Sequence, residues 1–116
     1  MPNLPGELPG NLSRQAVDDL SRILRRSARE FGVTVARQSR ERLLAVVRAI
    51  EAGTVVGHRR QDVQPRRPTV FFNEAPWVIC FNPHTRQVYR ILHGARHFPA
   101  LFGDSDPGTG MRGDTT

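Results

Sequence analysis

Residues 77–102, WVICFNPHTRQVYRILHGARHFPALF, decide which fold this chain is expected to adopt. The first five, 77–81, are apolar, β-branched or aromatic, a pattern typical of a short buried strand. Residues 82–85, Asn-Pro-His-Thr, favour a turn because Asn starts turns and Pro presets φ. Residues 86–93 then predict a returning strand. Two strands this close in sequence pair most simply as an antiparallel hairpin.

Three ionisable side chains gather where the second strand ends: His93, Arg96 and His97. Gly94 lies among them and permits a sharp exit from the strand and the close approach of another molecule. Candidate chemistry is therefore expected at this end of the hairpin.

Two amphipathic helices are predicted upstream. Ser13 is suited to cap the first helix and Gly32 to end it. The second helix starts at residues 33–34 and is expected to end at Gly53. Because one or two residues separate them, the helices must fold back as an antiparallel pair. Their apolar positions recur at three- and four-residue steps: Val17, Leu20, Leu24, Ala28 and Phe31 in the first, and Val35, Ala36, Leu43, Val46, Val47 and Ile50 in the second.

A third strand is predicted at residues 69–72, Thr-Val-Phe-Phe, with a turn at 74–76 leading into the hairpin. A very short additional strand is expected at 10–13. Helices followed by a run of strands indicate the α+β class. The expected architecture is a two-helix antiparallel hairpin packed on a small three- to four-stranded antiparallel sheet.

The chain is expected to form one domain, over residues 11–102, because 116 residues rarely build more. Residues 1–10 are rich in Pro and Gly and are expected to form a flexible arm. Residues 103–116 have almost no apolar side chain and are expected to be disordered.

Charge is concentrated in the predicted domain. Every basic residue in the chain is Arg, and residues 11–102 hold 16 of the 17, against seven Asp and Glu, for a net charge of +9. A small domain this basic usually meets a polyanion or an acidic protein. Residues 1–10 lack the apolar core of a signal peptide, and no run approaches the ~20 apolar residues of a membrane span. We therefore expect a cytoplasmic protein without a membrane partner.

The basic side chains form one candidate site. Arg can hold a phosphate by two hydrogen bonds, and His can move protons near neutral pH. Cleavage of RNA through its 2′-hydroxyl needs such groups and no metal. Cys80 is expected to be a small buried apolar residue, and the four His lack zinc-ligand spacing, so no metal or cofactor is expected. The candidate residues are Arg59, Arg60, Arg66 and Arg67 before the third strand, and Arg90, His93, Arg96 and His97 at the end of the hairpin.

Strand alternation supplies a competing interpretation. It places Arg90 on one face with Val88 and Leu92, and His93 on the other with Tyr89 and Ile91. Only one face should pack on the helices, so at least one charged group lies on an otherwise apolar face. A structural ion pair is therefore the alternative to catalysis or partner contact for Arg90. Tyr89 is expected to pack rather than to catalyse.

Residues 90–96, RILHGAR, with Leu101 and Phe102 beyond them, resemble the C-terminal part of the ParE/RelE superfamily of type II toxin–antitoxin toxins. The upstream helices fit the same plan, so the resemblance covers about residues 11–102. It is greatest to the ParE-like, plasmid stabilisation branch. It implies a toxin that is neutralised by a cognate antitoxin in a hetero-oligomer.

The two branches of this superfamily imply different targets. ParE-like toxins inhibit DNA gyrase, whereas RelE-like toxins cut mRNA on the ribosome. In the RelE-like case Arg90, His93, Arg96 and His97 would be catalytic. Phe98 follows His97 where RelE-like nucleases commonly carry a Tyr, which favours the ParE-like branch, although His97 stands where ParE-like chains are often acidic.

The expected contact residues for the target or the antitoxin are Arg59, Arg60, Arg66, Arg67, Arg90 and Arg96. Two alternatives stay open at this point. The chain could be a nucleic-acid-binding module without catalysis, which predicts a steep salt dependence of affinity. It could also be a decayed toxin that only binds its antitoxin.

Overall fold

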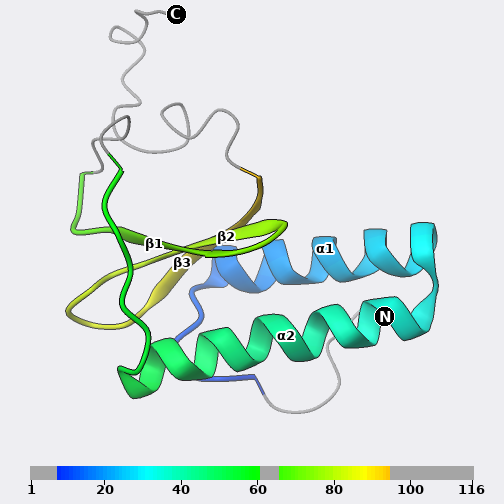
Figure 1. The fold of residues 1–116 in the computed structure, drawn as a ribbon, viewed down its shortest axis with the longest axis horizontal. Helices are drawn as coiled ribbons and strands as arrows, with labels where there is room; N and C mark the ends of the chain where they lie inside the picture. Colours follow the sequence, from blue (N-terminus) through cyan, green and yellow to red (C-terminus); the bar gives the residue numbers. More distant parts are fainter. Residues whose placement is uncertain (1–7, 61–65, 95–116) are drawn as a thin grey trace, which may run out of the picture.

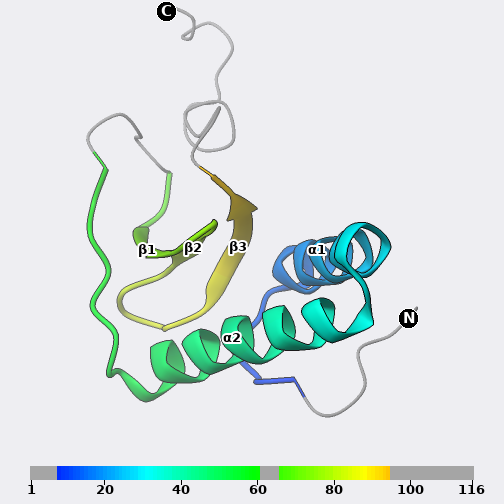
Figure 2. The same ribbon diagram turned by 45° about the vertical axis from the view of Figure 1, so that its right-hand side comes forward.

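The computed structural model describes residues 8–60 and 66–94. Two helices, α1 (Arg14–Phe31) and α2 (Val33–Ala52), form an antiparallel pair that lies along one side of a small sheet (Figures 1 and 2). The sheet contains β1 (Val70–Glu74), β2 (Trp77–Phe81) and β3 (Val88–His93), in that order, with both pairs antiparallel. The predicted α+β architecture is confirmed, with three strands.

Local signals set the ends of both helices. The Ser13 side chain accepts a hydrogen bond of 3.0 Å from the backbone N–H of Ala16, so Ser13 caps α1 as predicted. Gly32 alone joins the helices, with φ at 99°, and Gly53 ends α2 with φ at 81°. Both are values that favour Gly because it lacks a Cβ atom.

The β2–β3 connection is longer than expected. The Asn82 side chain accepts hydrogen bonds from the backbone N–H groups of His84 and Thr85, which is typical of an Asx turn. Arg86 has φ at 70°, and its N–H bonds to the Asn82 carbonyl at 2.9 Å. The strand that was predicted to start at residue 86 therefore starts at Val88.

The main core lies between the helices and the sheet. Its sheet side chains alternate along β2, at Trp77, Ile79 and Phe81. The helices contribute Leu20, Leu24, Leu43, Val47 and Ile50 from the predicted apolar stripes, together with Ala16 and Leu44. A second, smaller cluster, formed by Phe71, Val78 and Cys80 with Leu92 packed against it, lies on the face of the sheet that points away from the helices. We call this second face the outer face. The buried main core consists of Ala16, Leu20, Leu24, Leu43, Leu44, Val47, Ile50, Val70, Trp77, Ile79, Phe81, Val88 and Ile91.

An irregularity in β3 corrects the predicted alternation. Cys80 pairs with Arg90, but Phe81 pairs with Val88, so Tyr89 is an extra residue on β3. Val88 consequently joins Ile91 in the main core, three residues away, while Leu92 packs on the outer face. The prediction that Val88 shares a face with Leu92 is wrong because a bulge shifts the alternation by one residue.

Residues 11–13 cover the edge of β3. The N–H of Val88 donates to the Asn11 carbonyl at 2.7 Å, and the N–H of Ser13 donates to the Val88 carbonyl at 3.0 Å. This contact is a single parallel bridge between Leu12 and Val88, where a very short strand was expected. Leu8, in the expected N-terminal arm, packs partly buried against the main core. Residues 1–7 and the expected tail, 103–116, lie outside the described residues.

Candidate partner-binding surfaces

Arg90 is held by a carboxylate from α1. Its Nε and Nη2 donate to the Asp19 carboxylate at 2.7 and 3.0 Å, a two-point pair between residues 71 positions apart. Asp19 is only 4% exposed and also accepts the backbone N–H of Ile91 at 3.0 Å. The hydrogen bond to Asp19 raises the pKa of the Arg90 guanidinium above its usual value. The structure therefore has the ion pair that was the alternative for Arg90.

The position of Asp19 in the sequence could have indicated this ion pair. Asp19 is one position before Leu20 and three after Ala16, both fully buried, so it lies on the apolar stripe of α1. A carboxylate in such a position needs a partner. Asp19 has two partners on strand β3. It accepts the backbone N–H of Ile91 and pairs with the positive charge of Arg90.

A row of side chains crosses the outer face of the sheet. Phe71, Cys80 and Arg90 are direct partners across the three strands. The Arg60 guanidinium lies over the Phe71 ring, 5.8 Å from its centroid. Burial raises the pKa of the Cys80 thiol to about 12, partly offset by the positive charge of Arg90. The thiol is therefore protonated near neutral pH, as expected of a buried structural Cys.

A second arginine stacks beside this row. The Arg67 guanidinium lies 3.7 Å from the centroid of the Tyr89 ring. The Tyr89 hydroxyl donates to the Pro68 carbonyl at 3.2 Å and accepts from Asn82 Nδ2 at 2.8 Å. Tyr89 is buried, as predicted for a packing residue.

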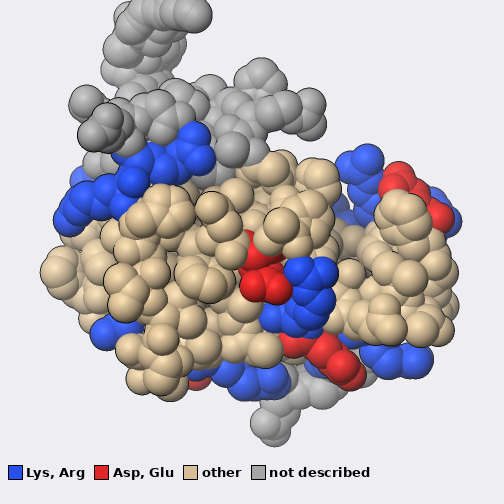
Figure 3. Space-filling model, viewed as in Figure 1, with Lys and Arg blue, Asp and Glu red and all other residues tan. Residues whose placement is uncertain are grey.

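We call the outer face with Arg60, Arg67 and Arg90 the arginine face. The neighbouring Arg59 and Arg66 are exposed. Figure 3 shows basic side chains gathered at the upper left of the molecule, where Figure 1 places the green segment that precedes β1. Arg60 and Arg67, from the segment before β1, therefore stack on aromatic rings of the sheet that also carries Arg90.

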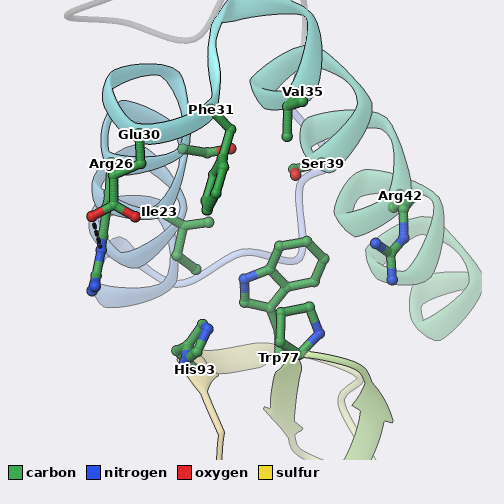
Figure 4. Close-up of a pocket in the computed structure, with 11 residues that line it drawn as sticks. Ile23, Arg26, Glu30, Phe31, Val35, Ser39, Arg42, Trp77 and His93 are labelled. Atoms are coloured by element: carbon green, nitrogen blue, oxygen red, sulfur yellow. Dashed lines mark hydrogen bonds and ion pairs between the residues drawn. The ribbon is translucent and has the colours of Figure 1, made fainter.

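His93 lies elsewhere, in an apolar groove between the helix pair and the sheet (Figure 4). Trp77 forms its floor, and the groove has a volume of about 340 Å³. Phe31 is 67% exposed and Val35 is 38% exposed, although both belong to the predicted apolar stripes. We call this site the Trp77 groove. It is lined by Ile23, Arg26, Ser27, Glu30, Phe31, Val35, Ser39, Arg42, Pro76, Trp77 and His93.

Charged side chains form two walls of the Trp77 groove. On α1, Arg26 Nε pairs with Glu30 at 3.0 Å. On α2, Arg42 Nη2 bonds to the Glu74 carboxylate at 3.1 Å and to the Ala75 carbonyl at 2.6 Å. The Arg42 guanidinium also lies over the Trp77 ring, 4.9 Å from its centroid. These contacts fix the β1–β2 turn against α2, while Phe31 and Val35 stay exposed beside them.

The structure describes two of the four predicted catalytic residues, and these two have different surroundings. Arg90 is bound to Asp19, while His93 faces the Trp77 groove. Arg96 and His97 lie outside the described residues. Residues 8–60 and 66–94 contain no cluster of three His, Cys, Asp or Glu side chains that could hold a metal ion. None of the helices in these ranges is long and apolar enough to cross a membrane.

These features together define a class of protein. It is a small basic α+β domain with a helix pair on a three-stranded sheet, an open apolar groove and an arginine face. A sequence model described as the ParE toxin of the type II toxin–antitoxin system, parDE, matches residues 11–98, more than half of the chain. The chain belongs to this family of toxins, and its family implies a cognate antitoxin as partner. Neither a curated protein nor a solved structure matches it.

Proposed function

We propose that this toxin acts by binding and inhibiting DNA gyrase, and that its antitoxin neutralises it by filling the Trp77 groove. The observation that carries the proposal is the exposed apolar surface of that groove. Phe31 and Val35, which line it, are 67% and 38% exposed, and Trp77 forms a floor between charged walls. Contiguous exposed apolar side chains rimmed by polar ones are typical of protein interaction sites.

The chemistry of the groove suits an amphipathic protein segment. Covering Phe31 and Val35 removes apolar surface from water, worth about 25 cal/mol for each Å². Arg26 and Arg42 are already paired with Glu30 and Glu74, so the walls present partly neutralised charge. Shape and apolar contact, rather than net charge, would therefore dominate binding in this groove.

Target binding is favoured over RNA cleavage by the positions of the candidate residues. An acid–base pair and a phosphate clamp must lie within hydrogen-bond reach of one substrate. Arg90 is engaged by Asp19, and His93 lies in the Trp77 groove rather than on the arginine face. The arginine face, with Arg96 as a further contact, is instead proposed to meet the target.

The target is tested by two assays of the purified protein. Gyrase supercoiling is measured in one, and cleavage of mRNA on programmed ribosomes in the other. Inhibited supercoiling with intact mRNA is the expected result. Cleaved mRNA with normal supercoiling would replace the proposal with a RelE-like activity.

The groove is tested by antitoxin rescue in growing cells, with the neighbouring open reading frames as candidate antitoxins. The Phe31→Glu variant should fold and stay toxic, because Phe31 is exposed in the free protein. The antitoxin should no longer rescue growth, because its binding would bury the new carboxylate. Val56→Glu is the matched control, since Val56 is 86% exposed and does not line the groove. Equal rescue of the two variants would remove the groove from the proposal.

A further inference from the structure

One guanidinium on the arginine face is held on a rigid platform. Arg67 lies over the Tyr89 ring, 3.7 Å from its centroid, which is within the distance range of a cation–π contact. The ring cannot move easily, because Tyr89 is only 3% exposed and its hydroxyl is bonded to Pro68 and Asn82. Arg67 thus has less freedom to lose on binding than an unsupported surface arginine.

Stacking leaves the hydrogen-bonding capacity of Arg67 unused. A guanidinium over a ring contacts it through its π face, while its N–H donors project in its own plane. Arg67 is exposed, and in the described part of the chain those donors have neither a hydrogen-bond nor an ion-pair partner. Arg90 differs, since Asp19 already takes its Nε and Nη2.

The surroundings indicate what kind of anion Arg67 receives. Single-stranded nucleic acids bind through bases that stack on exposed aromatic rings. The aromatic rings of the arginine face are buried: Phe71 is 1% exposed and Tyr89 is 3% exposed. Both already carry an arginine on a face. A carboxylate needs no ring and matches the two parallel donors of a guanidinium.

We propose that Arg67 is a two-point receptor for a carboxylate on an acidic segment of a protein partner, and that Tyr89 is its positioning residue. The inference rests on the proposed function, in which the toxin acts through protein partners. It adds the chemistry of the contact and the residue that orders it. Tyr89 acts through Arg67 and the Pro68 carbonyl rather than by touching the partner.

The test measures the affinity of the full-length protein for a fluorescein-labelled peptide of ten glutamates, by anisotropy at low salt. Arg67→Lys keeps the charge but loses the planar donors, so we expect about fivefold weaker binding. Arg37→Lys, at an exposed position on α2, is the matched control and should stay within about 1.5-fold of the wild type. Equal effects of the two substitutions would overturn the proposal.

Tyr89 is tested with two substitutions, each checked for folding by circular dichroism. Tyr89→Leu removes the platform, and we expect it to weaken peptide binding as much as Arg67→Lys does. Tyr89→Phe keeps the ring and the fold but loses both hydroxyl contacts, with an expected loss of about twofold. An unchanged affinity in a folded Tyr89→Phe variant, with a normal Tyr89→Leu variant, would refute the positioning role.

A 20-nucleotide single strand serves as the competing probe. Tighter binding of this strand than of the peptide, lost in Arg67→Lys, would assign the site to nucleic acid and overturn the proposal. The supercoiling and rescue assays report independently on the proposed function. A peptide affinity that is insensitive to Arg67 in a protein that still inhibits gyrase would therefore refute this inference alone.

Discussion

Removal of the Asp19 carboxylate should destabilise this protein more than any other single charge change on α1. Asp19 accepts two hydrogen bonds from Arg90, one from the Ile91 N–H and one from Arg22. Asp19→Ala would leave the Ile91 N–H unpaired in a buried site, which costs about 1–3 kcal/mol. It would also leave the Arg90 charge without its partner.

The size of the effect follows from burial. Breaking a fully buried ion pair from one side costs about 3–5 kcal/mol. The Arg90 side chain is 22% exposed, so water can replace part of the lost contact, whereas the Arg22 pair is exposed enough to add little. We expect Asp19→Ala to lower the free energy of unfolding by about 3 kcal/mol, or roughly 15 °C in melting temperature.

Urea unfolding at pH 7, followed by the fluorescence of Trp77, measures this loss. The single Trp of the chain is buried in the main core and so reports on its exposure. Asp18→Ala is the matched control, because Asp18 is the exposed neighbour on the same helix, and it should cost under about 0.5 kcal/mol. Asp19→Ala together with Arg90→Met should recover part of the loss, since no unpaired charge remains. Equal stabilities of the Asp18 and Asp19 variants would refute the role assigned to the pair.

Three further predictions concern the core and the groove. Trp77→Ala should lower the free energy of unfolding by roughly 3–5 kcal/mol, measured by circular dichroism because the fluorophore is lost; a change below about 1 kcal/mol would contradict its placement in the core. The pKa of the Cys80 thiol, raised from 9.0 to about 12, predicts that stability falls as pH rises from 9 towards 12, because only the unfolded thiol ionises there. In Cys80→Ala, the part of this fall in stability that comes from the thiol should be absent. A pH profile of stability identical to that of the wild type would contradict this prediction. Arg42→Leu should lower the free energy of unfolding by about 1 kcal/mol, because it removes an exposed ion pair with Glu74 and the stacking on Trp77. An unshifted Trp emission in this variant would show that the stacking is absent in solution.

Much of the framework could be predicted from local sequence. Ser13, Gly32 and Gly53 set the helix ends through their own backbone preferences, and the apolar run at 77–81 predicted β2 to the residue. The family could be predicted as well, since the RILHGAR segment lies within the residues that match the ParE toxin model. Turn chemistry was recognised at Asn82, but the turn extends through Arg86 because that residue adopts a left-handed backbone.

The surfaces proposed for binding depended on contacts between distant residues. The apolar stripe of α1 predicted Phe31 as an apolar position but not its exposure, because that depends on how far the sheet extends beneath the helix pair. The arginines before β1 were evident, yet nothing local showed that Arg67 would stack on Tyr89. The sequence showed which residue types these surfaces contain, but not which residues lie next to one another.

By itself, the sequence determined the helix pair, the strand pairing and the basic character of this toxin, because capping, hydrophobic period and charge are local properties. Only the tertiary structure decided that Arg90 is bound to Asp19, that His93 faces the Trp77 groove, and that Tyr89 bulges out of register. The physical reason is that ion pairs, grooves and strand register are set by packing between elements rather than within one. A residue's type states what it can do, and its neighbours in space determine which of those things it does.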